Sequence, residues 1–234
     1  MKIALLGYGR MGKTIENIAK ARGHEIVTII DKDNPKDSLN DAEVAINFSI
    51  PSSAVENITH ALNEGVAVVC GTTGWLDSLA DIESLCINKK GAFLYASNFS
   101  LGVNIFFALN EKLAQIMGQH KQFNVSLSEI HHTKKLDAPS GTAITLAEGI
   151  LPYIEKNTWA LEEDAKEIDL TIRAERMADV PGTHTVDYNS ETDKISIEHI
   201  AHNRDGFALG SVIAAEWLNG KSGIFTMKDV INIT

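Results

Sequence analysis

The sequence has little that would tie the chain to a membrane or to an oxidising compartment. Its only cysteines are Cys70 and Cys86, and no apolar run approaches the ~20 residues of a membrane-spanning helix. The cysteines lack metal-ligand or redox spacing, which favours two reduced thiols. The N-terminal run reaches Gly7 too early for a signal-peptide core. We therefore expect a cytoplasmic protein that binds no membrane.

Positive charge is also scarce. The chain has 21 Lys and Arg residues against 31 Asp and Glu residues, which gives a formal net charge of -10. Nucleic-acid binding requires clustered Lys and Arg, and here these residues are scattered, so a nucleic-acid partner is not expected. If the ligands are anions, local cationic groups must bind them despite the negative electrostatic field of the whole protein.

The first hundred residues alternate strand-like and helix-like segments. Short apolar runs predict buried strands at Lys2–Leu6, Glu25–Ile30, Val44–Phe48, Val66–Cys70 and Ala92–Tyr95. Apolar residues at helical spacing predict helices at Met11–Arg22, Ser53–Asn63 and Leu76–Asn88. The alternation indicates an α/β, Rossmann-like parallel sheet with helices on its faces. The short polar stretch Asp31–Glu43 indicates that one crossover helix is missing.

The pattern changes after Phe99 and predicts a second, α+β domain. Helices are expected at Val103–Met117 and Thr142–Ile154. Strands of a mostly antiparallel or mixed sheet are expected at Asn124–Ile130, Asp169–Glu175, His184–Tyr188 and Lys194–His199. We assign 1–100 and 207–234 to a dinucleotide-binding domain, and 101–206 to a substrate-binding and oligomerisation domain. A last helix, expected at Leu209–Leu218, and the short apolar C-terminal tail could return to either domain.

A glycine fingerprint follows the first predicted strand and opens the first helix: Gly7, Tyr8, Gly9, Arg10, Met11 and Gly12. The first glycine of such a turn makes the tight bend, the second lets the backbone approach a pyrophosphate, and the third lets helix and strand pack closely. The free N–H groups at the helix N-terminus then bind phosphate. The fingerprint predicts a nicotinamide dinucleotide site, with a purely structural turn as the alternative.

Residues after the second and fourth strands extend this predicted site. Asp31 is placed to accept hydrogen bonds from the adenosine ribose, which favours NAD, whereas Lys32 could pair with a 2′-phosphate and admit NADP. Dual use of NADH and NADPH is the plain inference, although Lys32 could equally be a surface lysine. Gly71, Thr72 and Thr73 fall where strand ends should face the cofactor, or form only a turn before a helix.

The segment from Glu129 to Thr142 holds the densest group of ionisable residues. His131, His132, Lys134 and Lys135 lie within five positions of a predicted polar loop, and Pro-Ser-Gly-Thr then starts a helix. The loop supplies a group that titrates near neutrality and ammonium groups for anions. The helix N-terminus offers N–H groups to a carboxylate.

Two alternatives remain for this segment. His131 and His132 could form a metal site with His184, His199 or His202, but no zinc-type or carboxylate spacing accompanies them, so no metal is expected. A solvated polar loop is the other alternative. It explains neither the density of ionisable groups nor the glycine-threonine start of the helix.

Residues 131–142, HHTKKLDAPSGT, resemble the signature of the dihydrodipicolinate reductase family, and other family motifs surround them in the same order. These motifs include GYGRMG at 7–12, GTTG at 71–74, NFSLGVN at 98–104, GTHTV at 182–186, HIAHNR at 199–204 and GIFTMKD at 223–229. The resemblance covers nearly the whole chain. It implies that reduced nicotinamide delivers hydride to a cyclic dicarboxylate derived from 4-hydroxy-tetrahydrodipicolinate, with loss of water, in lysine and diaminopimelate biosynthesis.

The resemblance also implies residue roles. His131 would donate or accept the proton that completes the reduction, and Lys135 would be a second acid or would stabilise developing negative charge. Substrate would be held by His132, Gly141, Thr142 and Arg204, although an ion pair within the second domain could equally explain Arg204. The cofactor would also contact Ala96, Ser97, Asn98 and Phe99. The family is typically a homotetramer assembled through the second domain's sheet.

Two other function classes are weighed against this one. Another small dehydrogenase with the same cofactor domain would not need the His-His to Gly-Thr segment. A nucleotide-sensing module would need the glycine fingerprint but neither His131 nor Lys135. Binding of the cofactor without turnover would identify such a module.

Overall fold

The structure, a computed structural model, describes residues 1–34, 37–203 and 205–233. Its backbone divides into two compact units, the first made of Met1–Asn104 with Asp205–Thr234 and the second of Ile105–Arg204. The boundaries predicted from sequence were 1–100, 101–206 and 207–234. The assignment of substrate binding and oligomerisation to the second unit stays a prediction.

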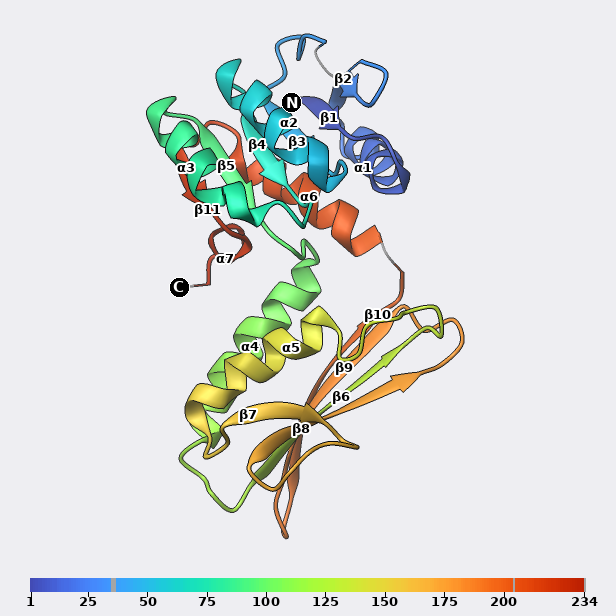
Figure 1. The fold of residues 1–234 in the computed structure, drawn as a ribbon, viewed down its shortest axis with the longest axis vertical. Coiled ribbons are helices and arrows are strands. Elements are labelled where there is room, and N and C mark those ends of the chain that lie inside the picture. The colour runs from blue at the N-terminus through green and yellow to red at the C-terminus, as the bar shows by residue number, and fades with distance from the viewer. Residues whose placement is uncertain (35–36, 204, 234) are drawn as a thin grey trace. The chain divides into compact units, whose positions relative to one another are not determined.

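Unit 1 is built on a six-stranded sheet in which every neighbouring pair is parallel (Figure 1). Its strands are β1 (Lys2–Leu6), β2 (Glu25–Ile30), β3 (Val44–Asn47), β4 (Ala67–Cys70), β5 (Ala92–Tyr95) and β11 (Gly223–Phe225). They lie in the order β11-β5-β4-β3-β1-β2, so the order reverses between β1 and β3. In such a sheet, ligands bind beyond the strand ends at this switch point.

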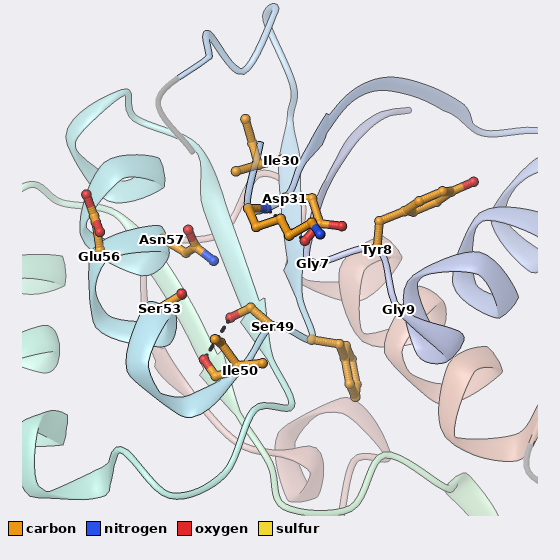
Figure 2. A pocket seen from close by; sticks show the side chains of 12 residues that line it. Gly7, Tyr8, Gly9, Ile30, Asp31, Ser49, Ile50, Ser53, Glu56 and Asn57 are labelled. Carbon is orange, nitrogen blue, oxygen red and sulfur yellow. Dashed lines mark hydrogen bonds between the residues drawn. The ribbon is translucent and has the colours of Figure 1, made fainter. Parts of the chain in front are cut away.

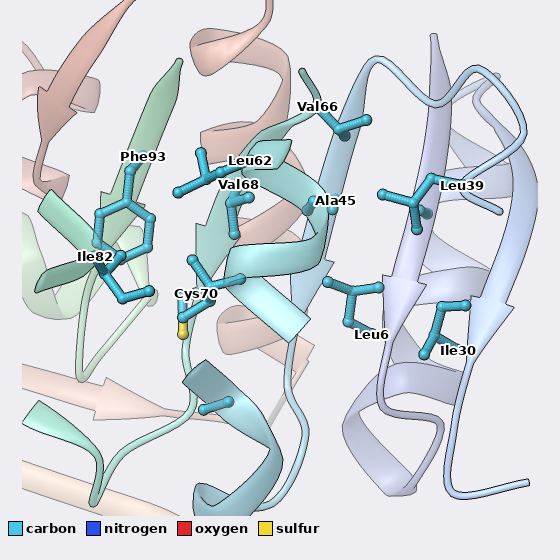
Figure 3. Close-up of a cluster of buried hydrophobic side chains, with 14 of the residues drawn as sticks. Leu6, Ile30, Leu39, Ala45, Leu62, Val66, Val68, Cys70, Ile82 and Phe93 are labelled. Atoms are coloured by element: carbon cyan, nitrogen blue, oxygen red, sulfur yellow. The ribbon is translucent and has the colours of Figure 1, made fainter. Parts of the chain in front are cut away.

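Helices cover both faces of this sheet because its strands are buried on both sides. Helices α2 (Pro51–Asn63) and α3 (Leu79–Asn88) pack on one face, and α1 (Arg10–Ala21), α6 (Asp205–Leu218) and α7 (Met227–Val230) on the other. Successive β1 residues alternate between the two cores, with Leu5 on the α1 side and Leu6 on the α2 side. Figure 3 shows the α2 side, where Leu6, Leu62 and Phe93 are fully buried.

Unit 2 has a mixed five-stranded sheet in the order β10-β9-β6-β8-β7. The strands are β6 (Asn124–His131), β7 (Thr158–Leu161), β8 (Asp169–Arg176), β9 (Gly182–Asn189) and β10 (Lys194–Ala201). β9 runs antiparallel to both β6 and β10, while β8 runs parallel to β6 and β7. Helices α4 (Leu101–Met117) and α5 (Gly141–Ile150) contribute to one apolar core with β6, β8 and β9.

The predicted fold class is confirmed, and most predicted elements lie within a few residues of the observed ones. The short strands β7 and β11 were missed because neither is long enough to show a period. The predicted helix 142–154 ends as α5 at Ile150 and continues as a 3-10 turn at Leu151–Tyr153. Pro152 explains the break, because proline has no N–H for an α-helical hydrogen bond. The predicted helix 76–88 likewise begins as a 3-10 turn at Leu76–Ser78.

The structure also tests the predictions for the C-terminal tail, the segment 31–43 and His131. The C-terminal tail joins unit 1, where β11 pairs with β5. No helix forms among the described residues of 31–43, as predicted. His131, expected on a polar loop, is instead the last residue of β6 and is buried. Within the described ranges, no helix combines the length and apolarity needed to cross a bilayer.

Candidate functional site

The glycines of the turn between β1 and α1 differ in what surrounds them. Gly7 has φ +95°, and a Cβ added there would lie 2.6 Å from the Phe48 carbonyl oxygen. A Cβ at Gly12 would overlap the Gly7 carbonyl oxygen. A Cβ at Gly9 would meet no described atom within 4 Å. Gly7 and Gly12 therefore close the turn, while Gly9 leaves open space beside the N-terminus of α1, as approach of a pyrophosphate requires.

A cavity of about 360 Å³ lies at this turn (Figure 2). Its lining comes from the β1–α1 turn, the end of β2, and the segment from β3 into α2: Gly7, Tyr8, Gly9, Ile30, Asp31, Lys32, Phe48, Ser49, Ile50, Ser53, Glu56 and Asn57. The Asp31 carboxylate accepts the backbone N–H of Lys32 at 2.9 Å. The cavity sits at the switch point between β1 and β3, so its position and its open glycine fit a dinucleotide.

Five of the predicted cofactor residues line this cavity: Gly7, Tyr8, Gly9, Asp31 and Lys32. The others do not line it: Arg10, Met11, Gly12, Gly71, Thr72, Thr73, Ala96, Ser97, Asn98 and Phe99. Two of them, Thr72 and Phe99, contact residues of the lining instead. The Thr72 hydroxyl donates to the Ser49 carbonyl at 3.2 Å, and the Phe99 and Phe48 ring centroids are 5.7 Å apart.

Sequence reasoning missed the cavity wall after β3, which comprises Phe48, Ser49, Ile50, Ser53, Glu56 and Asn57. No glycine-rich or ionisable motif marks this segment. The available signal was positional, because the strand that follows β1 across the switch point must also end at the ligand crevice. The prediction placed cofactor residues after the first, second, fourth and fifth strands, but none after the third.

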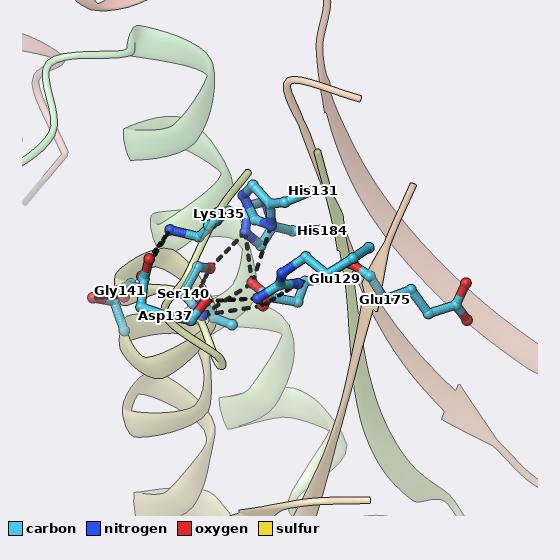
Figure 4. Close-up of polar contacts among 11 residues, drawn as sticks. Glu129, His131, Lys135, Asp137, Ser140, Gly141, Glu175 and His184 are labelled. Atoms are coloured by element: carbon cyan, nitrogen blue, oxygen red, sulfur yellow. Dashed lines mark hydrogen bonds and ion pairs between the residues drawn. The ribbon is translucent and has the colours of Figure 1, made fainter. Parts of the chain in front are cut away.

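The second constellation lies in unit 2, where β6 ends. Glu129 and His131 are two residues apart on β6 and so project from the same face of the sheet. His184 extends from the neighbouring strand β9, and its ring centroid lies 5.0 Å from that of His131. Figure 4 shows Glu129, His131 and His184 grouped beside Ser140. These four side chains are all buried.

Buried charge sets the protonation of this cluster. Burial alone would raise the pKa of Glu129, but His184, Ser140 and His131 outweigh that effect and lower the pKa to about 2. Burial lowers the pKa of His131 to about 4, although Glu129 acts in the opposite direction. At neutral pH the cluster therefore holds an ionised Glu129 and a neutral His131.

The loop after β6 carries the predicted cationic groups. The Lys135 ammonium donates to both carboxylate oxygens of Asp137, at 2.9 and 2.7 Å. Lys134 is exposed. The Arg176 guanidinium, from β8, donates to the Asp137 carbonyl at 2.6 Å and lies 3.4 Å from Glu129. Arg176 thereby ties the loop to the buried carboxylate.

The loop ends at the N-terminus of α5, which the sequence predicted to bind a carboxylate. Ser140 is the N-cap residue, and its hydroxyl accepts the Ala143 N–H at 3.2 Å. Gly141 is exposed and Thr142 is half-buried. A Cβ at Gly141 would meet no described atom within 4 Å, so this helix end is open. His132 follows His131 and is half-buried, while Arg204 lies outside the described residues.

Glu129, His131 and His184 also place one potential metal-ligand atom each within 4.8 Å of one another. The carboxylate oxygens, however, both accept the Ser140 N–H at 3.1 Å and face the Arg176 guanidinium. A cation there would have to displace these donors, so the arrangement favours a hydrogen-bonded network. Among the described residues, His132, His199 and His202 belong to no such group of ligand atoms.

Comparison with known families matches both halves of the chain. Residues 1–99 match the family described as dihydrodipicolinate reductase, N-terminus, and residues 102–231 match dihydrodipicolinate reductase, C-terminus. The second match includes α6, β11 and α7, which return to unit 1.

Individual relatives agree with these matches. A 4-hydroxy-tetrahydrodipicolinate reductase from Christiangramia forsetii is 55% identical over 99% of this chain and 98% of its own length. One from Thermosipho africanus is 34% identical over the same shares. The solved structure of dipicolinate-bound dihydrodipicolinate reductase from Paenisporosarcina sp. has a TM-score of 0.78 at 21% identity, and the comparison covers 100% of this chain and 99% of that one.

Proposed function

Since this chain belongs to the dihydrodipicolinate reductase family, we propose how its residues divide the work of that reaction. The chain is an oxidoreductase that reduces 4-hydroxy-tetrahydrodipicolinate to tetrahydrodipicolinate with loss of water, using a nicotinamide dinucleotide. The function predicted from the sequence is thereby confirmed. The residue assignment rests on one observation: His131, Lys135 and the open N-terminus of α5 lie near one another in unit 2.

The substrate-binding site must hold a ring that carries two negative charges, and it must supply one proton to that ring. The reduced nicotinamide supplies the hydride, so the protein must supply the matching proton and hold the ring still. One substrate carboxylate binds the N–H groups at the start of α5, with Gly141 and Thr142 as its nearest residues and His132 beside them. The relative bound to dipicolinate, a planar dicarboxylate, supports this ligand class. Arg204 remains a predicted second partner.

His131 handles the proton. Its imidazole is neutral in the free protein because burial penalises the charged form. A dianionic substrate adds negative charge beside the ring, which raises the His131 pKa and lets the imidazole carry a proton to the reduced product.

Lys135 provides positive charge at the same place. Its ammonium is held by the exposed carboxylate of Asp137, and a substrate carboxylate can compete for it. The ammonium then stabilises negative charge that develops on the ring as hydride arrives, or gives up a proton that reaches the product. Lys134 has no such role, because it is exposed.

Both NADH and NADPH serve as reductant in this proposal. Among the described residues that line the cavity in unit 1, two are acids, Asp31 and Glu56, and one is a base, Lys32. The Asp31 carboxylate suits the free ribose hydroxyls of NADH, whereas Lys32 provides the countercharge for the 2′-phosphate of NADPH. Because the acids outnumber the base, we expect tighter binding of NADH.

The proposed assembly is a homotetramer formed through the sheet of unit 2. In the described part of the chain, α4 and α5 cover one face of this sheet, and β10 forms its edge. Ile200 of β10 is 51% exposed. An uncovered face and a long free edge strand are surfaces that other chains can pair with. The free thiols of Cys70 and Cys86 are consistent with a cytoplasmic location.

The test is oxidation of NADH, and separately NADPH, by the purified protein with freshly generated 4-hydroxy-tetrahydrodipicolinate. His131→Ala and Lys135→Ala should each lower kcat by about 10²-fold or more, the usual contribution of a positioned acid or base. Lys134→Ala is the matched control and should retain activity. Cofactor binding should survive in all three variants. Turnover by His131→Ala at the wild-type rate would contradict the assignment, and cofactor binding without any wild-type turnover would indicate a sensor.

A further inference from the structure

Glu129 is the one fully buried carboxylate among the described residues, with 0% of its surface exposed, and no role has so far been assigned to it. Along the same face of β6 the preceding residue is Leu127, which belongs to the apolar core of unit 2. An apolar residue at 129 would continue that core. Replacing a buried ion-pair network by apolar residues is often neutral or stabilising, so stability alone does not explain the carboxylate.

The contacts of Glu129 join two parts of the proposed active site. Both of its oxygens accept the backbone N–H of Ser140, the N-cap of α5, at 3.1 Å. Its Oε2 lies 3.4 Å from Nδ1 of His131. Its Oε1 lies 3.4 Å from the Arg176 guanidinium, and its Oε2 also lies 3.6 Å from Nε2 of His184. A single carboxylate thus touches both the proposed proton carrier and the first residue of the substrate-binding helix end.

We propose that Glu129 is a positioning residue for the reduction, which orients His131 through its Nδ1 and fixes the start of α5 through the Ser140 amide. This inference rests on the role of His131 proposed above. Nδ1–H directed toward the carboxylate leaves Nε2 as the nitrogen that exchanges a proton with substrate. The carboxylate also stabilises the imidazolium whenever the ring is protonated.

The surroundings of Nε2 agree with this orientation. Gly182 lies beside it, and an added Cβ there would be 3.0 Å from Nε2. The separation between Glu129 and His131 is short enough for an ion pair, but its angles do not make a hydrogen bond. Contacts of this kind commonly tighten when substrate binds. The Ser140 hydroxyl, in turn, lies 3.1 Å from Nε2 of His184, and that nitrogen lies 3.6 Å from the same Oε2 of Glu129 that faces His131.

Four titratable or charged groups face His131, each from a different element. They are Glu129 on β6, His184 on β9, Arg176 on β8 and Lys135 on the following loop. Only Glu129 favours the protonated ring, while the other three disfavour it. Removing the charge of Glu129 must therefore make His131 harder to protonate, which a purely structural role would not require.

The experiment compares Glu129→Gln with Glu129→Asp in the full chain. Glu129→Gln keeps nearly the same shape but loses the charge, and Glu129→Asp keeps the charge on a shorter side chain. Glu175→Gln on β8 is the matched control, because its carboxylate lies 3.2 Å from Arg173 and outside the cluster. For each variant we would measure kcat, KM, the Kd of NADH, thermal unfolding, and the His131 titration by NMR.

We expect Glu129→Gln to lower kcat by about 10²-fold, the scale of one acid–base contribution. It should also lower the pKa of His131 below its wild-type value, with the Kd of NADH unchanged. Glu129→Asp should recover part of both losses, and Glu175→Gln should match the wild type.

A folded Glu129→Gln with wild-type kcat would overturn the proposal, as would a loss of kcat without any change in the His131 titration. If Glu129→Gln does not fold, Glu129→Asp decides: a His131 pKa and kcat that both move away from wild type support the proposal, and no change in either overturns it. Should His131→Ala itself retain activity, the proposed function of His131 fails, and that result is read independently of Glu129.

Discussion

The carboxylate of Glu129 and the imidazole of His131 lie on one face of β6, with Oε2 and Nδ1 separated by 3.4 Å. Residues two apart in a strand project the same way, so this pairing is built into the backbone of β6. Both side chains are buried at the point where the strand meets the loop that holds Lys135. The consequences of this pair extend to stability as well as to catalysis.

Acid should destabilise the protein in two steps. The folded-state pKa of His131 is about 4 against an ordinary 6.5, so the unfolded chain binds its proton first and stability falls as the pH drops from 6.5 to about 4. The pKa of Glu129 is about 2 against 4.5, which adds a second loss below pH 4.5. Urea unfolding across this range measures both steps. In His131→Gln the first step should shrink, and an unaltered profile would contradict the assignment.

Gly182→Ala should impair turnover, and it should also lower thermal stability somewhat, because Gly182 has φ +159°. The added Cβ would lie 3.0 Å from Nε2 of His131, so the ring must shift away from the position in which it meets substrate. We expect kcat to fall by roughly tenfold or more, since small misplacements of a reacting group have large effects. Thr183→Ala, at the next position on β9, is the control and should stay close to wild type. Equal kcat values for the two variants would argue against a reactive Nε2.

Gly9→Ala and Gly12→Ala should fail in different ways. A Cβ at Gly9 meets no described atom within 4 Å, so the variant should fold normally and yet weaken NADH binding by roughly tenfold, or about 1.4 kcal/mol. A Cβ at Gly12 would overlap the Gly7 carbonyl, so that variant should lose thermal stability. Calorimetric titration and thermal unfolding separate the two effects. Wild-type affinity in Gly9→Ala would place the pyrophosphate elsewhere.

Lys32→Ala should change cofactor choice. Lys32 is the one base among the described residues that line the cavity, and its loss removes a countercharge for a 2′-phosphate. We therefore expect kcat/KM to fall severalfold with NADPH and to change little with NADH. Lys20→Ala is the control, because Lys20 on α1 pairs with Glu16 and does not line the cavity. The effect on NADPH should weaken as salt is added. A similar loss with both cofactors would refute a role in phosphate recognition.

Ile200→Lys should disturb assembly. If the sheet of unit 2 forms the tetramer, a charge at this half-exposed position places four ammonium groups in apolar contacts. Light scattering should give four times the chain mass of 25.5 kDa for the wild type and a smaller mass for the variant. Lys194→Ala, at the start of β10, serves as the control. A wild-type mass equal to one chain would end the tetramer proposal.

The sequence alone determined the features whose signals are local. The strands β1 to β5 of unit 1 are short continuous apolar runs, and the turn from Gly7 to Gly12 is a contiguous motif, so both could be predicted without knowing what surrounds them. The same holds for the segment from His131 to Thr142, where the ionisable residues and the helix start follow one another along the chain.

Only the tertiary structure decided which groups surround those motifs. Glu129 is two residues before His131 in the sequence, but nothing in the sequence indicated that it would be fully buried. Nor did the sequence indicate that its carboxylate would contact both Ser140 and Arg176. His184 joins them from β9 because β9 pairs with β6, a contact between segments far apart in the chain.

The cavity wall from Phe48 to Asn57 could not be predicted from the sequence for the same reason. Its residues carry no motif, and they line the cavity because β3 lies next to β1 in the sheet. Strand order, burial and the pKa values that follow from burial are set by long-range packing, whereas a turn or a helix start is set by the residues that form it. That difference separates what could be predicted here from what could not.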